Sequence, residues 1–398
     1  MPKPRILIHM HYMELGGAER ALLGLLEALD TDRVSVDLLI NQHTGPFMPL
    51  IPGKINLLPE MRGYNAIERP MRDIVLEGQW RVAWARWKGL NKSNKASRER
   101  GIQGSAQHYI MDEVIRVLPS LEHLGTYDLA LSFIDPPHIV QQKISARKRM
   151  EWLHTDFTAF KIDQERFCET WDKNDYIVAV SDDLARIFVE TYPQYAKKTI
   201  VIENILSPAI VRRQSDEFIP EEMPEKQGVF RLLSVGRIAP VKNYKCIPQV
   251  AKRLKELGLK FVWYVVGPGN HAAIDREAVE LGVAEKVRFL GSKNNPYPYI
   301  KACDIFVQPS LREGKSVTVR EAQVLCKPVI ITRYATANSQ LQDGVDGLIC
   351  ELDNDSIAEA IYNLATNPDY CRRLSEYLAC HDYGNETEVE KLYKILDY

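Results

Sequence analysis

The sequence predicts two doubly wound α/β domains, each built on a parallel sheet. A chain of 398 residues is long enough for two hydrophobic cores. Short apolar runs alternate with amphipathic segments along most of its length, which is typical of strands and helices that alternate around parallel sheets. The alternation breaks once, over residues 207–228, where charged residues and prolines gather.

The N-terminal half begins as a βαβ unit. An apolar strand is followed by a loop with Gly16 and Gly17, and leucines then recur at helical spacing over 18–29. Six strands are expected in this half: Arg5–His11, Val34–Ile40, Tyr127–Phe133, Arg149–His154, Tyr176–Val180 and Thr199–Ile205. We therefore place an N-terminal Rossmann-like domain at residues 1–206.

The C-terminal half repeats this organisation. Its expected strands are Arg231–Val235, Lys260–Val266, Val287–Leu290, Asp304–Gln308, Val329–Thr332 and Gly347–Cys350. The pattern from 356 to 398 is helical almost throughout. We place a linker at 207–228 and a second domain at 229–398. Two facing domains of this kind form a deep cleft, with ligands beyond the carboxyl ends of the strands.

The composition excludes several classes of function. The formal net charge of −2 argues against nucleic-acid binding through an overall basic field. The 7 cysteines lack the spacing of a zinc site or a disulfide framework, which favours reduced thiols in the cytoplasm. The first apolar run is too short for a signal peptide, and no window reaches the ~18 apolar residues that a membrane span needs.

The first candidate for chemistry lies at residues 234–243, where the first strand of the second domain ends. Gly236 permits a sharp turn, and Arg237 and Lys242 place two cations over the sheet edge. Paired cations stabilise the negative charge that grows on a departing phosphate, best where water is excluded. The alternative interpretation is two solvated surface cations.

The second candidate lies at residues 313–321, after the strand at 304–308. Carboxylates only accept hydrogen bonds, so Glu313 and Glu321 suit sugar hydroxyls, one on the transferred sugar and one on a nucleotide ribose. Between them a glycine admits a ligand, and free backbone N–H groups open a helix whose dipole favours phosphate; these donor-binding candidates are Gly314, Lys315, Ser316 and Val317. Alone, two such glutamates would be an ordinary solvated helix face.

Taken together, these motifs resemble the retaining glycosyltransferases of family 4, which have the GT-B architecture. That family combines an upstream arginine and lysine with a glutamate, seven residues and a second glutamate. The resemblance also covers the glycine loop at 16–20 and the segments 289–291, 304–310, 327–330 and 343–348. It implies transfer with retention of configuration, no metal ion or other cofactor, a nucleotide-sugar donor in the second domain and a glycan or lipid-linked acceptor in the first. A UDP-sugar is the expected donor. In this architecture the final helices often cross back onto the first domain, so the C-terminal helix is expected to pack there.

The chain departs from the family pattern in two places. Members commonly carry an aromatic residue and then proline or glycine where this chain has Lys315-Ser316. Many carry two glycines and a glutamate where it has Ala335-Thr336 and Ser339-Gln340. The identity of the donor sugar therefore stays open.

Two strand ends of the first domain add candidates. In similar enzymes the glycine loop faces the donor, so Gly17 is placed in the site; the alternative is a tight strand–helix turn. His154 would hydrogen-bond the sugar or the reaction centre, as the histidine at the matching strand end does in similar transferases. Asp156 would orient His154 or touch the acceptor. A structural histidine is the alternative.

A basic segment at residues 72–100 raises the question of a membrane. Trp80, Trp84 and Trp87 fall at i, i+4 and i+7, on one face of a predicted helix. A basic helix with such a stripe binds an anionic bilayer surface in the plane of the membrane, and similar enzymes often extend lipid-linked glycans. A peripheral position on the inner face of the cell membrane follows from that interpretation. A helix packed on its own core shows the same pattern.

Other classes of protein fit less well. Gly314-Lys315-Ser316 resembles the end of a P-loop, but Pro309 stands where that motif requires glycine. The loop at 16–21 lacks the G-x-G-x-x-G of a nicotinamide enzyme. An epimerase or hydrolase of nucleotide sugars on the same fold, or a nucleotide-sugar-binding protein without turnover, remains an alternative.

Overall fold

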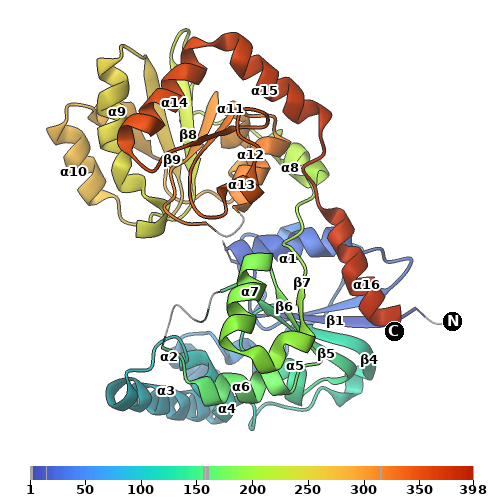
Figure 1. The fold of residues 1–398 in the computed structure, drawn as a ribbon. Coiled ribbons are helices and arrows are strands. Elements are labelled where there is room, and N and C mark those ends of the chain that lie inside the picture. The colour runs from blue at the N-terminus through green and yellow to red at the C-terminus, as the bar shows by residue number, and fades with distance from the viewer. Residues whose placement is uncertain (1–2, 15, 156, 158–160, 314–315, 398) are drawn as a thin grey trace. The chain divides into compact units, whose positions relative to one another are not determined.

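The chain folds into two compact units (Figure 1). The computed structural model describes residues 3–397 except 15, 156, 158–160, 314 and 315. Unit 1 comprises Met1–Ile205 with Asn385–Tyr398, and unit 2 comprises Leu206–Gly384. Each unit is a parallel sheet with helices packed on it, so the predicted fold class is confirmed.

The sheet of unit 1 has seven strands in the order β3-β2-β1-β4-β5-β6-β7. Their bounds are β1 Arg5–Met10, β2 Ser35–Ile40, β3 Asn56–Leu57, β4 Thr126–Ser132, β5 Ser145–Leu153, β6 Tyr176–Ala179 and β7 Thr199–Val201. All but β3 lie within or overlap the predicted strands. Two residues are too few to show a strand period, which is why β3 was not predicted.

Both faces of this sheet are buried. In β1, Ile6 and Ile8 pack in one cluster with Leu25 of α1, whereas Leu7 packs in another with Ile110 of α4. Burial on both faces explains why the strands are continuous apolar runs. The helices of the unit are α1 Gly17–Ala28, α2 Met71–Leu76, α3 Trp80–Arg100, α4 Ala106–Val114, α5 His138–Gln142, α6 Gln164–Asp172, α7 Asp182–Thr191 and α16 Val389–Asp397.

Unit 2 has a six-stranded parallel sheet in the order β10-β9-β8-β11-β12-β13. The strands are β8 Phe230–Val235, β9 Phe261–Val266, β10 Val287–Phe289, β11 Ile305–Gln308, β12 Val329–Thr332 and β13 Leu348–Cys350. Its helices are α8 Pro208–Ser215, α9 Ile247–Glu256, α10 Ala272–Glu280, α11 Tyr297–Ala302, α12 Val317–Val324, α13 Ala337–Gln340, α14 Asn354–Thr366 and α15 Pro368–Cys380. Among the described residues of both units, no helix combines the length and apolarity needed to span a bilayer.

The segment predicted as a linker, 207–228, differs from that prediction. Its first part is helix α8, which begins with Pro208 in the first turn, where a missing N–H costs nothing. Val211 of this helix and Met223 beyond it are buried in a core cluster of unit 2. Charged residues separate these buried apolar side chains, so the segment shows no helical period in its sequence.

The last segment of the chain belongs to unit 1. Helix α16, in red in Figure 1, contributes Leu392 and Tyr393 to the core cluster that contains β1 and α1. The Tyr393 hydroxyl accepts a hydrogen bond from the Asp30 backbone N–H at 2.7 Å, and the Arg33 guanidinium lies over the Tyr393 ring. Unit 2 is therefore inserted, in sequence, between two parts of unit 1.

Candidate active site

The loop after β8 is held against the loop after β9. Gly236 has a φ of 155°, and its N–H donates to the Val266 carbonyl at 2.9 Å. A Cβ added at Gly267 would lie 2.0 Å from the Gly236 carbonyl oxygen, so the two backbones can meet only because residue 267 is glycine. This close approach fixes the path of the chain into Arg237. The Arg237 side chain is exposed and forms no ion pair with any described residue.

The two sequence motifs meet in this unit. Lys242 lies in a short 3-10 helix, Pro240–Lys242, and its Nζ is 2.6 Å from Oε1 of Glu313. The Leu311 N–H donates to the Val241 carbonyl at 2.8 Å, which ties the two loops together by their backbones. Both side chains are mostly buried, at 19% and 12% exposed. Residues 71 positions apart thus form one polar centre at the carboxyl edge of the sheet.

The Glu313 carboxylate is oriented by its neighbours. Besides Lys242, Oε1 accepts a hydrogen bond from the Ser310 hydroxyl at 2.6 Å and from the Gln308 amide at 3.3 Å. The Thr336 hydroxyl donates to the Glu313 backbone carbonyl at 2.7 Å. These side-chain contacts all fall on one oxygen, which leaves Oε2 as an acceptor for the hydroxyl of a ligand.

Sequence reasoning missed several residues around this carboxylate. The hydroxyls of Tyr244 and Tyr334 and Oε1 of Gln308 are buried and form no hydrogen bond of normal geometry with the described residues, although Gln308 lies close enough to Tyr244 to oppose the rise of its pKa. Burial, and then the charge of Glu313, raises the pKa of both tyrosines well above its usual value. Native proteins rarely leave so many buried polar atoms unpaired, so the arrangement fits a polar ligand. The position of Tyr244, two residues after Lys242, is the one sequence signal that could have pointed to it.

The start of α12 corrects part of the prediction. The Ser316 N–H, which was expected to be free for a phosphate, donates to Oε1 of Gln340 at 2.6 Å. Gln340 is 1% exposed, and its Nε2 has no partner among the described residues. The amide of Gln340 is therefore the unpaired donor at this helix start. Val317 is the first residue of α12; Gly314 and Lys315 lie outside the described residues.

Glu321 lies in the interior of unit 2. It is 1% exposed, and its Oε1 accepts a hydrogen bond from the Tyr297 hydroxyl at 3.0 Å. Its described hydrogen bond is thus to Tyr297 and not to Lys242 or Glu313. A hydrogen bond from Glu321 to a nucleotide ribose stays a prediction.

The candidates in unit 1 occupy the ends of β1 and β5. Gly17 is the first residue of α1, and a Cβ added there would meet no atom within 4 Å. Burial lowers the pKa of His154 to about 4, so the ring is neutral at physiological pH, and its Nε2 has no partner among the described residues. Asp156 lies outside the described residues. That Gly17 and His154 face a donor stays a prediction.

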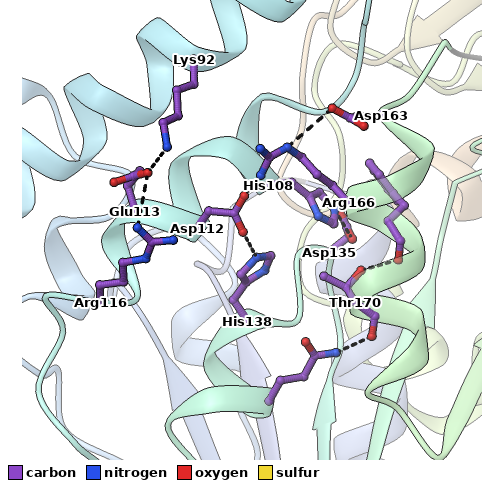
Figure 2. A network of polar contacts seen from close by, with 12 residues as sticks. Lys92, His108, Asp112, Glu113, Arg116, Asp135, His138, Asp163, Arg166 and Thr170 are labelled. Carbon is purple, nitrogen blue, oxygen red and sulfur yellow. Dashed lines mark hydrogen bonds and ion pairs between the residues drawn. The ribbon is translucent and has the colours of Figure 1, made fainter.

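A buried ionic network underlies the same sheet of unit 1 (Figure 2). The His108 Nε2 lies 2.9 Å from both carboxylate oxygens of Asp135. Burial, and then the charge of the neighbouring Asp135 carboxylate, raises the pKa of Glu151 well above its usual value. His138 Nε2 lies 3.0 Å from Asp112. No group of three or more His, Cys, Asp or Glu among the described residues is arranged to hold a metal ion.

Unit 1 is expected to lose stability in mild acid. Burial lowers the pKa of His9 and of His138 to about 3, and that of His154 to about 4, against 6.5 in an unfolded chain. As the pH falls below 6.5, these histidines are protonated in the unfolded chain before they are protonated in the folded protein. Each of them therefore lowers the free energy of unfolding by on the order of 2 kcal/mol by pH 5. Thermal unfolding at pH 7 and at pH 5 measures the loss. His138→Gln keeps a donor for Asp112 and should show a smaller loss; an unchanged pH dependence would contradict this origin.

Comparisons with known proteins agree with this geometry. Residues 215–379 match the family model of "Glycosyl transferases group 1", and this range contains Arg237, Lys242, Glu313 and Glu321. Over 99% of both chains, the structure is similar to that of Alr3699/HepE of Anabaena in complex with UDP-glucose, with a TM-score of 0.66 at 15% identity. The two units of the chain therefore have the GT-B fold of these glycosyltransferases. A second structure with this fold, WaaG, "a glycosyltransferase involved in lipopolysaccharide biosynthesis", gives a TM-score of 0.64 at 14% identity over 98% of this GT-B chain.

Curated relatives of this GT-B chain are also glycosyltransferases by name. It is 31% identical over 142 residues to the UDP-Gal:alpha-D-GlcNAc-diphosphoundecaprenol alpha-1,3-galactosyltransferase of Escherichia coli, covering 34% of the chain and 36% of the relative. It is 22% identical over 418 residues to the D-inositol 3-phosphate glycosyltransferase of Corynebacterium jeikeium, covering 96% and 92%. The first four curated relatives that it matches are each spanned over less than half of their length.

Proposed function

We propose that the protein is a retaining glycosyltransferase that moves a sugar from a nucleotide-diphosphate donor to a glycan or lipid-linked acceptor in cell-surface polysaccharide synthesis. The contact between Lys242 and Glu313 carries this proposal, together with the exposed Arg237 in the same loop as Lys242. A cation for a diphosphate beside a carboxylate for a sugar hydroxyl would suit a nucleotide sugar, and the pair lies at the carboxyl edge of a parallel sheet, where such folds bind ligands.

The chain's own residues supply charge stabilisation and orientation. Arg237 and Lys242 would bind the diphosphate and stabilise the charge that develops on it as the glycosidic bond breaks. Oε2 of Glu313 would accept a hydrogen bond from a hydroxyl of the transferred sugar, while its Oε1 stays fixed by Ser310 and Lys242. In the proposed route the acceptor hydroxyl enters on the face that the phosphate leaves, the phosphate takes its proton, and no metal ion or protein nucleophile is used.

The nature of the substrates is supported by the comparisons. Alr3699/HepE binds UDP and UDP-glucose, which favours a UDP-sugar as donor. Two relatives are named for acceptors linked to diphosphoundecaprenol, which favours a lipid-linked acceptor and work at the inner face of the cell membrane.

Incubation with UDP-glucose, UDP-galactose, UDP-GlcNAc or UDP-GalNAc, with and without GlcNAc-diphosphoundecaprenol, tests the proposal. Release of UDP that depends on the acceptor, together with an α-linked product seen by NMR, is expected. Activity should persist in EDTA. A changed sugar would indicate an epimerase, acceptor-independent UDP release a hydrolase, and UDP binding without turnover a binding protein; each would overturn the proposal.

A further inference from the structure

Three tryptophans of α3 are exposed. Trp80, Trp84 and Trp87 are 63%, 64% and 49% exposed, and the rings of Trp84 and Trp87 stack with centroids 4.8 Å apart. Leu76, the last residue of α2, is 73% exposed just before them. The other three tryptophans of the chain are buried: Trp152, Trp171 and Trp263.

The opposite face of α3 packs on the protein. Val82, Ala85 and Gly89 are buried, and a Cβ added at Gly89 would lie 2.5 Å from the Ile110 Cα, so α3 and α4 are in backbone contact there. Lys92 of α3 also forms an ion pair with Glu113 of α4 (Figure 2). Small residues therefore make the helix–helix contact, and the tryptophans point away from the core. The interpretation of the stripe as a core-packed face is wrong.

The charged residues around the three tryptophans indicate what kind of partner binds this surface. Residues 72–100 carry eight Arg or Lys and three Asp or Glu. Arg81 and Lys88 lie beside the tryptophans on the helix surface, and both are exposed. Indole rings with a polar N–H prefer the boundary between lipid headgroups and acyl chains, and neighbouring cations favour anionic headgroups. A protein partner would have to match the same excess of cations.

The apolar stripe covers only the first part of the helix. Beyond Trp87 the same face continues as Asn91, Asn94 and Arg98, all exposed and polar. We propose that Leu76 and the first two turns of α3 insert into the headgroup boundary of an anionic bilayer, while the rest of the helix stays in the aqueous layer. This deepens the proposed function by naming the surface that would bring the enzyme to a lipid-linked acceptor.

Vesicle co-sedimentation with the full chain tests this directly. Binding to phosphatidylglycerol-containing vesicles, weaker binding to pure phosphatidylcholine, and a blue shift of the tryptophan emission are expected, because the other three indoles are already buried. The W80A/W84A/W87A variant should bind at least about tenfold more weakly, since three indoles leave the lipid. The I219A/V279A variant removes two exposed apolar side chains of unit 2, at 90% and 67% exposed, and should bind like the wild type.

Two matched substitutions separate insertion from simple attraction. Trp84→Glu and Asn94→Glu change the charge of the same helix face by the same amount. Trp84→Glu should abolish most binding, and Asn94→Glu should leave it within about threefold, because only salt-screened attraction is reduced. Equal losses, or tryptophan variants that bind like the wild type, would overturn the proposal. So would a change from dimer to monomer in W80A/W84A/W87A, which would mark a protein interface. The shift in melting temperature on addition of UDP measures donor binding independently of vesicle binding. A protein that fails to bind vesicles could therefore still have the proposed transfer activity.

Discussion

Replacement of Lys242 by alanine is expected to lower the rate of sugar transfer by about 10²–10³, the loss typical when one charge-stabilising donor is removed. The side chain contacts Glu313 at 2.6 Å and is mostly buried, so water cannot easily replace its charge. Arg237→Ala should cause a loss of the same order, because Arg237 is the other cation of the loop. Steady-state release of UDP from the donor, with acceptor present, measures both.

Lys245→Ala is the matched control. Lys245 lies three residues after Lys242 and is exposed, so its removal should leave turnover unchanged. Circular dichroism should show that all three variants keep the fold. Near-normal turnover in either Lys242→Ala or Arg237→Ala would remove that residue from the proposed site.

Gly267→Ala is expected to destabilise unit 2 and to lower activity. The new Cβ would lie 2.0 Å from the Gly236 carbonyl oxygen, and the φ of Gly267, 151°, is one that alanine rarely adopts. Overpacking and backbone strain each cost about 1–3 kcal/mol, so a loss of roughly 3 kcal/mol is expected. Because the Gly236 backbone must move to relieve the clash, Arg237 should be displaced as well. Thermal unfolding and UDP affinity measure the two effects.

The Gly258→Ala variant separates the cost of backbone strain from the cost of a steric clash. Gly258 also has a positive φ, 78°, but an added Cβ would meet no atom within 4 Å. Its alanine variant should lose only the strain, about 1 kcal/mol, with UDP affinity unchanged. If Gly267→Ala is no worse than Gly258→Ala, the two loops are not held by this contact.

The sequence predicted the strands more accurately than the helices that pack around them. Strands such as β1 and β11 are buried on both faces, and a short apolar run between turn residues is a sufficient signal for that. Helix α8 was missed because its buried residues, Pro208, Val211, Gln214 and Ser215, are not an apolar set at helical spacing. The exposure of Trp80, Trp84 and Trp87 was also out of reach, since helical spacing defines a face but not what covers it.

Of the candidate site, the sequence predicted the charged residues but not the contacts that surround them. Arg237, Lys242 and Glu313 could be found because they follow strands whose carboxyl ends share one edge of the sheet. The pairing of the Ser316 N–H with Gln340, and the burial of Glu321 against Tyr297, depend on how helices pack between those strands. Tertiary packing of that kind leaves no spacing in the sequence.

Because the chain returns to unit 1, unit 2 is an inserted domain that could be removed as one piece. The chain leaves unit 1 after Ile205 and re-enters it at Asn385, and the Asn385 side-chain amide donates to the Asn204 carbonyl at 3.1 Å. The two crossing points are therefore neighbours, and a short peptide joining them would close unit 1 without its insert. Residues 206–384 could then be exchanged for the equivalent unit of another protein with this fold, which would show which unit determines the choice of ligand.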